Sequence, residues 1–325
     1  MPPEGWYTLE LGGETIDVFR DVYGVPHVFA PSVLGAFRAQ GYVVAEDRCL
    51  QLLKRREAVL GRMAALNGES GLGHDRSIRT RGFTREEMQG MMDALPARQR
   101  EYLEAYTEGI NAYLARVAPD IPPVETYEFV AGAVYFITRI GDMLDQDYDL
   151  YRMLGVVRIF KGDEFARNML NDCMPLDVPT APTTDHSRPE PEEGRAPASE
   201  KPVPSKAIPN PGPLAALLRE ELALRAYARA QGVSAELGSQ AWAVSPERSA
   251  TGNAMLFASP HLQFDVPANG VLTHLVAPGL NISGVSHVGI PGIIVGHNER
   301  IAWGVTSGLL DQYDVYVEEL HPDDP

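Results

Sequence analysis

A proline-rich segment divides this chain and limits how it can fold. Residues 174–213 hold eleven of the 26 prolines, with Ser, Thr, Glu and Lys between them and almost no aromatic side chains. Such a stretch cannot bury enough apolar surface to offset the entropy lost on ordering it, so we expect an extended linker. A short helix is predicted over 214–231, with Gly232 suited to cap it. The linker therefore separates two blocks, residues 1–173 and residues 239–325.

The two blocks differ in hydrophobic pattern. The first opens with a strand-like alternation at 15–20 and a turn at 23–26. Helical periodicity then predicts a mostly helical region, with helices at 33–61, 98–117 and 148–160. The second block has short apolar runs between Gly, Pro and Asn, which predict strands at 242–244, 255–258, 271–275, 293–295, 301–305 and 313–317. Helices, a linker and then strands favour an α+β protein.

Composition excludes several classes of partner. Asp and Glu outnumber Lys and Arg by 44 to 28, and a net charge of −16 repels phosphate backbones and anionic lipid. We therefore expect neither nucleic-acid nor membrane partners. Cys49 and Cys173 lie far apart and outside metal-ligand spacing, which predicts small buried residues rather than a disulfide or zinc site. The sequence contains no run of eighteen apolar residues, so it predicts no membrane-spanning helix.

The junction between the linker and the first predicted strand, Gly238-Ser239, is the strongest candidate for chemistry. By itself, Gly-Ser before a strand is an ordinary turn. Gly238 tolerates the backbone strain that would expose its carbonyl to attack by the Ser239 hydroxyl. As a chain terminus, Ser239 would carry its own base, because an α-amine has an ordinary pKa near ~8.

Several motifs resemble the penicillin acylase family. Residues 239–244 are similar to the start of the second chain in that family, whose precursor is cut at a Gly-Ser bond. The other matching motifs are 20–27, 41–48, 55–56 with 61–62, 106–111, 251–252 with 259–262, and 291–304. The run from Gly296 to Gly304 is the most specific of these. The resemblance covers most of the chain apart from the linker.

This resemblance implies an N-terminal nucleophile hydrolase with a four-layer αββα core, incomplete here, and a helical first chain. It implies autocatalytic cleavage between Gly238 and Ser239, removal of a spacer within 174–238, and pairing of the two resulting chains. The activity would be hydrolysis of a linear acyl amide, such as a β-lactam side chain or an N-acyl homoserine lactone. Family members are often periplasmic or secreted, but residues 1–5 do not resemble a signal peptide. A cytoplasmic location or a leader outside this sequence both stay open.

The resemblance also implies roles for individual residues. Ser239 would be the nucleophile, and His261 would orient its amine, as in cephalosporin and acyl-homoserine-lactone acylases; penicillin G acylases tend to have glutamine there. The backbone N–H of Ser307 would donate to the oxyanion. The second oxyanion donor of the family is an asparagine far downstream, and no residue before Pro325 matches it.

A substrate pocket and a calcium site are further expectations from the family. The acyl pocket would be lined by Arg139, Leu262, Val295 and Val305. The alternative for each of these residues is an ordinary position in the core or on a helix surface. A structural Ca²⁺ would be held by Asp147, Asp311, Tyr313 and Asp314, since hard cations take oxygen ligands. By itself, an acidic run such as the one around Asp147 is more often a solvated helix face. No organic cofactor is expected.

Two other functions compete with this interpretation. Only 87 residues follow position 238, so the chain could be a non-catalytic fragment, or half of a split acylase that needs a partner chain. It could also be a ligand-binding protein that keeps the fold without the reaction. A false lead is the run 284–289, which looks like a nucleophile elbow but has one residue too many.

Overall fold

The computed structural model describes residues 4–129, 238–261 and 266–306, with a few isolated positions besides. The chain splits into two compact units, residues 1–143 with 224–308 and residues 144–223 with 309–325. The three continuous stretches belong to the first unit, which is described below. The predicted linker, the helices at 148–160 and 214–231 and the strand at 313–317 lie essentially outside the described residues. The division into first chain, spacer and second chain therefore stays a prediction.

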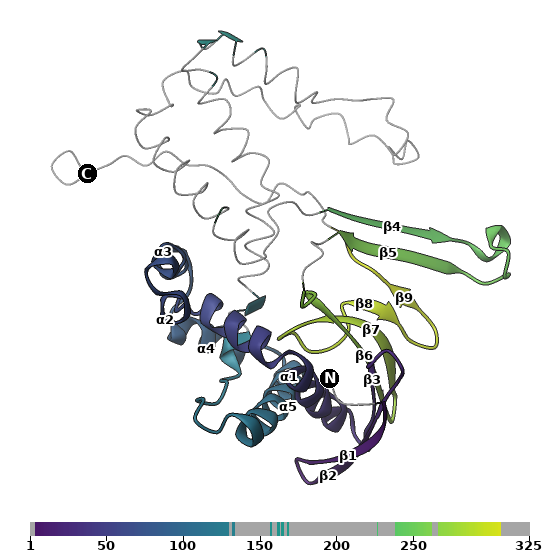
Figure 1. The fold of residues 1–325 in the computed structure, drawn as a ribbon. Helices are drawn as coiled ribbons and strands as arrows, with labels where there is room; N and C mark the ends of the chain where they lie inside the picture. The colour runs from purple at the N-terminus through teal and green to yellow at the C-terminus, as the bar shows by residue number, and fades with distance from the viewer. Residues whose placement is uncertain are drawn as a thin grey trace. The chain divides into compact units, whose positions relative to one another are not determined.

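The described residues form an α+β structure built on a seven-stranded sheet (Figure 1). In sheet order the strands are β1 (Gly5–Leu11), β2 (Glu14–Arg20), β3 (Pro26–Phe29), β6 (Gly270–Ala277), β7 (Leu280–His287), β8 (Val295–His297) and β9 (Ala302–Trp303). Neighbours are antiparallel except β3 and β6, which pair in parallel. Because β3 precedes the linker and β6 follows it, the two blocks of the sequence share one sheet.

The first block contains more strand than the sequence predicted. The alternation at 15–20 is β2, as expected, but β1 and β3 flank it and were missed. In β1 burial alternates along the whole strand, but only Leu9 and Leu11 are fully buried and the apolar Trp6 lies on the exposed face, so the apolar pattern in the sequence is weak. Gly12 and Gly13 join β1 to β2 with positive φ angles of 60° and 77°, which side chains disfavour. The description of this block as mostly helical was thus incomplete.

Helices follow the three strands. Helices α1 (Val33–Val59) and α5 (Ala97–Val117) confirm two predicted helices. Ser32 caps α1 by accepting a hydrogen bond from the Gly35 N–H, and the helix is kinked at Arg48. The sequence analysis missed four short elements, α2 (Ala64–Asn67), the 3₁₀ turn η1 (Gly68–Gly71), α3 (Leu72–Arg81) and α4 (Arg85–Ala94).

The core draws on both blocks. One buried cluster packs α1 against the sheet, and its members include Ala36, Ala39, Val18, Val28 and Leu275. A second buried cluster joins α1 and α5 to β6 and to the turn after β7, and its members include Val44, Tyr106, Ile110, Val271 and Val288. Cys49 is half-buried against this second cluster, which agrees with its predicted role as a small packed residue. The residues after the linker therefore complete the core that the residues before it begin.

Helices α1 and α5 cross where a glycine of each helix packs against the backbone of the other. A Cβ added at Gly41 would lie 2.0 Å from the Tyr106 carbonyl oxygen, and one at Gly109 would lie 1.8 Å from the Arg38 carbonyl oxygen. Both obstacles are backbone atoms of the facing helix, so no side-chain rotation can make room. The close approach therefore requires glycine at both positions.

Replacing Gly109 by Ala is expected to lower the free energy of unfolding by about 1–3 kcal/mol, because the two helices must separate. Gly90 in α4 is a matched control, since nothing lies within 4 Å of its Cβ position. Gly90→Ala is expected to stabilise by up to about 1 kcal/mol through helix propensity. Urea unfolding of both variants measures this. Equal effects of the two changes would show that the crossing is not tight.

The remaining strands form a separate hairpin. Strands β4 (Gly238–Val244) and β5 (Met255–His261) pair antiparallel, and the 3₁₀ turn η2 (Pro246–Arg248) lies between them. The predicted strands at 242–244, 255–258 and 271–275 are confirmed, while β8 and β9 are shorter than or shifted from the predicted runs. The sequence analysis did not predict β7.

Candidate active site

The candidate nucleophile lies at the start of the hairpin. Ser239 is the second residue of β4, half-buried, and paired with Pro260 of β5. His261 ends β5 opposite Gly238 and is exposed. The structure therefore brings the predicted cleavage site and the predicted histidine to adjacent positions across one hairpin.

Side-chain direction qualifies this arrangement. Residues paired across an antiparallel ladder project to the same face, and successive residues alternate. Ser239 and His261 are one register position apart, so their side chains project to opposite faces of the hairpin. The group that His261 is predicted to orient is the backbone amine of residue 239, which is not restricted to the face of the Ser239 hydroxyl.

A third segment approaches the hairpin on the face that carries Ser239. Ala258 pairs with Ala241, and this pair shares its face with the Ser239–Pro260 pair. A Cβ added at Gly304 would lie 2.2 Å from the Ala258 Cβ. The chain after β9 thus runs close over this face as it leads toward position 307. The small residues of this segment are visible in the sequence, but Ala258 as the residue that they approach is not.

The predicted pocket residues are only partly described. Val295 is half-buried in β8, where it pairs with Val285, and Val305 is exposed just after β9. Arg139, Leu262 and Ser307 lie outside the described residues, as do the predicted calcium ligands Asp147, Asp311, Tyr313 and Asp314. Within the described part, no three His, Cys, Asp or Glu side chains gather around a common point that could hold a metal. The substrate pocket, the oxyanion contact from the Ser307 N–H and the calcium site stay predictions.

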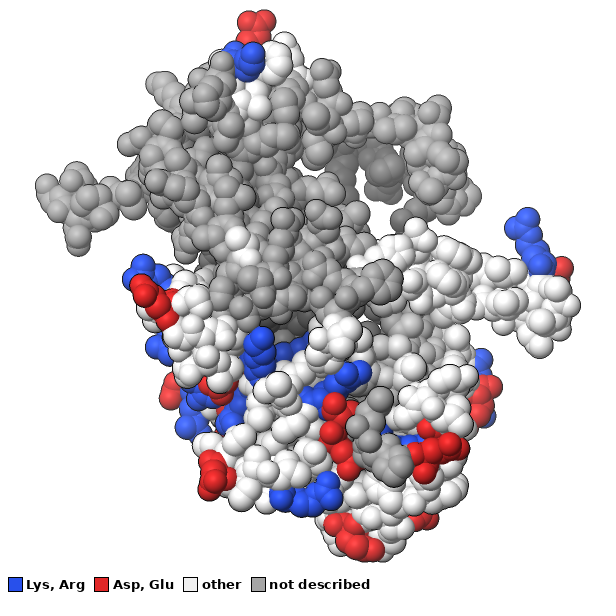
Figure 2. Space-filling model, viewed as in Figure 1, with Lys and Arg blue, Asp and Glu red and all other residues white. Residues whose placement is uncertain are grey.

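The hairpin carries an apolar surface. Trp242 and Phe257 stack with ring centroids 4.2 Å apart, and both are about half exposed. Met255 and Leu256 are exposed beside them. Figure 2 shows the hairpin without charged side chains except at the turn that joins its strands, where Glu247 and Arg248 lie in η2. By the alternation of side chains along a strand, the Trp242–Phe257 stack lies on the face of the hairpin opposite the Ser239 side chain.

The apparent nucleophile elbow at 284–289 is a structural element. Ser286 lies fully buried in β7, and Gln40 of α1 donates to its hydroxyl over 3.1 Å. The same amide donates to the Gly292 carbonyl at 2.9 Å and accepts from the Gly292 N–H at 2.8 Å. Ser286 is thus fully engaged in tying α1 to the strands of the second block, which leaves Ser239 as the better nucleophile candidate.

The half-buried Arg55 cation lies just beyond the same end of β7. Arg55 of α1 donates to the Val288 carbonyl at 2.8 Å and to Asn269 Oδ1 at 2.6 Å. Burial, and then the Arg55 cation, lower the pKa of His287 to about 4. An ordinary histidine has a pKa of 6.5, so the unfolded chain binds this proton more tightly than the folded chain.

The folded protein is therefore expected to lose stability as pH falls from about 6.5 to about 4, by an amount of the order of 3 kcal/mol for this group. His287→Gln is expected to flatten this part of the pH profile, measured by urea unfolding at several pH values. His297→Gln, at an exposed position of β8, is the control. An unchanged profile in His287→Gln would contradict the assignment.

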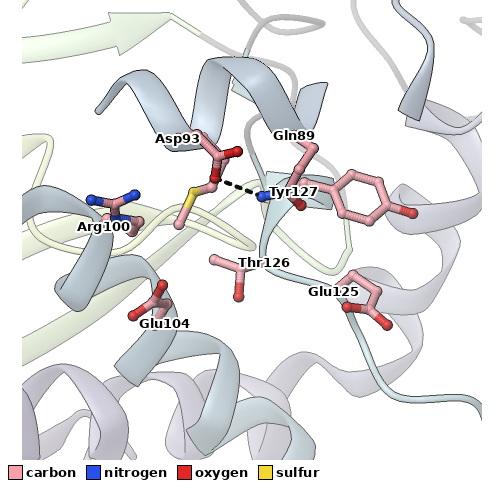
Figure 3. A pocket seen from close by; sticks show the side chains of 8 residues that line it. Gln89, Asp93, Arg100, Glu104, Glu125, Thr126 and Tyr127 are labelled. Atoms are coloured by element: carbon pink, nitrogen blue, oxygen red, sulfur yellow. Dashed lines mark hydrogen bonds between the residues drawn. The ribbon is translucent and has the colours of Figure 1, made fainter. Parts of the chain in front are cut away.

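A recess elsewhere in the first block is unrelated to the predicted site. It has a volume of about 420 Å³ and lies between α4, α5 and residues 125–127. Figure 3 shows its polar lining, in which Gln89 donates to Asp93 over 2.9 Å. None of the predicted site residues lines it.

Comparison with known proteins decides the family. A model described as penicillin amidase matches residues 15–325. The chain belongs to the penicillin amidase family. The resemblance based on motifs is therefore confirmed, over nearly the whole sequence.

Individual family members are similar at lower identity. Penicillin acylase 2 proenzyme of Pseudomonas sp. (strain SE83) is 29% identical over 99% of this chain and 40% of its own length. The acyl-homoserine lactone acylase QuiP of Pseudomonas aeruginosa is 26% identical, over 98% of this chain and 36% of its own length. Penicillin G acylase of Escherichia coli is 24% identical, over 97% and 41%. The chain thus spans about two fifths of these relatives.

A solved structure is also similar. Thermostable penicillin G acylase from Alcaligenes faecalis shares 27% identity, with a TM-score of 0.44, over 54% of this chain and 99% of that one.

No described helix has the length and apolarity needed to cross a membrane.

Proposed function

We propose that this penicillin amidase family member is a self-processing amidohydrolase that uses Ser239 as an N-terminal nucleophile. The observation that carries the proposal is the position of Ser239. It follows the predicted linker and spacer helix in the sequence, is the second residue of β4, and shares its face of the hairpin with the segment that leads to position 307. The names of the relatives, two penicillin acylases and an acyl-homoserine lactone acylase, support amide hydrolysis and do not favour a non-catalytic fragment.

In this mechanism, the Ser239 hydroxyl first attacks the Gly238 carbonyl, and the Gly238–Ser239 C–N bond breaks, which frees the Ser239 amine and leaves Gly238 as an ester on the hydroxyl. Water then hydrolyses this ester, which releases the Gly238 carboxylate and restores the Ser239 hydroxyl. That amine then takes the hydroxyl proton as Ser239 attacks the acyl carbonyl of the substrate. The Ser307 N–H would stabilise the oxyanion, and His261 would orient the amine. The amine product leaves first, and water releases the acyl group from the ester.

We further propose that the protein has the four-layer core of N-terminal nucleophile hydrolases and that the two products of cleavage stay associated. The shared sheet and shared core of the two blocks support this, since each would expose apolar surface alone. A structural Ca²⁺ at Asp147, Asp311, Tyr313 and Asp314 belongs to the same proposal. The substrate class is an acyl amide, either a β-lactam side chain or an N-acyl homoserine lactone.

Amine release from chromogenic acyl amides and from N-acyl homoserine lactones tests the function. We expect turnover that follows the fraction of chain cut before Ser239. Amine release by uncut chain at the same rate would argue against an N-terminal nucleophile. Absence of release from fully cut chain would refute the amidohydrolase assignment.

A further inference from the structure

Two histidines from the two blocks of the chain meet in the sheet. His27 of β3 and His274 of β6 are paired positions of the parallel ladder. Their Nδ1 atoms lie 2.9 Å apart, with the rings edge to face. The next residues, Val28 and Leu275, are buried under α1. Because side chains alternate along a strand, both imidazoles project from the opposite face of the sheet.

The outer nitrogen of each ring faces an oxygen atom. His274 Nε2 is 2.9 Å from Asn281 Oδ1, and His27 Nε2 is 3.6 Å from Asp21 Oδ2. An oxygen acceptor at Nε2 favours the tautomer protonated there. With both Nε2 atoms protonated, neither Nδ1 carries a proton, so the 2.9 Å contact joins two acceptors, and a cation bound between them would stabilise it.

We propose that His27 and His274 form a two-histidine site for a divalent transition-metal ion such as Zn²⁺. Imidazole nitrogen suits Zn²⁺, Ni²⁺ and Cu²⁺. A ligating histidine almost always donates its other N–H to a carboxylate or carbonyl oxygen. Asn281 lies at hydrogen-bond distance for this role behind His274, and the Asp21 carboxylate lies 3.6 Å from the outer nitrogen of His27. These ligands are distinct from the oxygen ligands expected for calcium.

The geometry fits with a small adjustment. Zn–N bonds of about 2.0–2.1 Å in a tetrahedral site place two ligand nitrogens roughly 3.3 Å apart, so the rings must open by a few tenths of an ångström. The His27 side chain is 28% exposed, which leaves room for this movement and for water. Since no third His, Cys, Asp or Glu completes the site within the described residues, water or a solute would fill the remaining positions. The bound ion would join β3 to β6, and so the blocks before and after the linker.

Isothermal titration of Zn²⁺ into the metal-stripped, untagged full chain tests this. We expect one ion per chain with micromolar affinity, and at least about a 10-fold loss in both His27→Asn and His274→Asn. His297→Asn is the control, because register places His297 in the same row, two strands from His274. Its affinity should equal that of the unchanged protein. No saturable binding, or binding that survives both histidine changes, would overturn the proposal.

Changes at Asn281 separate metal binding from folding defects. Asn281→Asp places a carboxylate behind His274 and is expected to tighten Zn²⁺ binding, a gain that misfolding cannot produce. Asn281→Leu is expected to weaken it by about 10–100-fold. If Asn281→Asp binds no more tightly than the unchanged protein, Asn281 does not support a ligating histidine and the site is wrong. Because this readout is metal affinity, it does not depend on cleavage or on amide turnover.

Discussion

Ser239→Ala is expected to leave the chain uncut between positions 238 and 239 and to abolish acyl-amide turnover. The hydroxyl acts twice in the proposed mechanism, first on the Gly238 carbonyl and then on the substrate. An alanine cannot replace it in either step. Loss of a nucleophilic serine typically lowers kcat by about 10⁴-fold or more. The change is read as a single uncut band on a denaturing gel together with loss of amine release.

Two further variants make this result specific. Ser259→Ala changes another half-buried serine on the same hairpin, paired with Gln240 next to Ser239, and should leave cleavage and turnover intact. Ser239→Cys keeps a nucleophile at the site and should still be cut. Cleavage in Ser239→Ala at the rate of the unchanged chain would contradict the self-processing mechanism.

Arg20→Met is expected to lower the free energy of unfolding by about 3–5 kcal/mol. Arg20 is 0% exposed. It donates to Glu46 at 2.8 Å, and to Asp47 and the Gly24 carbonyl at 2.9 Å each. Burial raises the pKa of Asp47 although Arg20 opposes this, so the carboxylate depends on its partner. Methionine would leave Asp47 without its ion pair and Glu46 with only the longer contact to Arg116.

Arg116→Met is the matched control. Arg116 also pairs with Glu46, but at 3.6 Å and with 59% of its side chain exposed. Exposed pairs of this kind contribute about 0–1 kcal/mol. Urea unfolding at neutral pH compares the loss in free energy of unfolding between the two variants. If Arg20→Met costs no more than Arg116→Met, the buried cluster does not hold β2 to α1 as described.

This cluster shows what sequence patterns can and cannot establish. The motifs at 20–27 and 41–48 were noted separately as similar to the family. The structure gives them one physical reason, because Arg20 of the first binds Glu46 and Asp47 of the second. Arg20, at an inward position of an alternating strand pattern, indicates that a buried partner of opposite charge exists. Nothing in the sequence identifies this partner as Glu46, which lies 26 positions away.

Strand β7 shows why a real element went unpredicted. Its Asn281, Ser283 and Ser286 interrupt the apolar pattern that signals a strand. These polar side chains are accommodated through tertiary contacts, such as the Gln40 amide on Ser286. Gly284 has φ 153°, and a Cβ there would lie 2.2 Å from the Val295 carbonyl oxygen of β8. Glycine is required at this position by the close packing of the two strands. In the sequence alone, however, a glycine usually indicates a loop.

The candidate site was predictable only at its centre. The Gly238-Ser239 junction and His261 follow from local motifs, and the structure places them across one hairpin. The approach of Gly304 to Ala258 depends on folding of residues 46 positions apart, so no local pattern predicts it. Substrate and calcium ligands were inferred by resemblance alone and stay predictions.

The most direct test of the account is N-terminal sequencing of the purified chain, combined with its intact mass. The account predicts a fragment that begins at Ser239, associated with a second fragment from the first block. A single uncut chain, or a fragment with any other start in the region of 238–242, would contradict the claim that Ser239 becomes an N-terminal nucleophile.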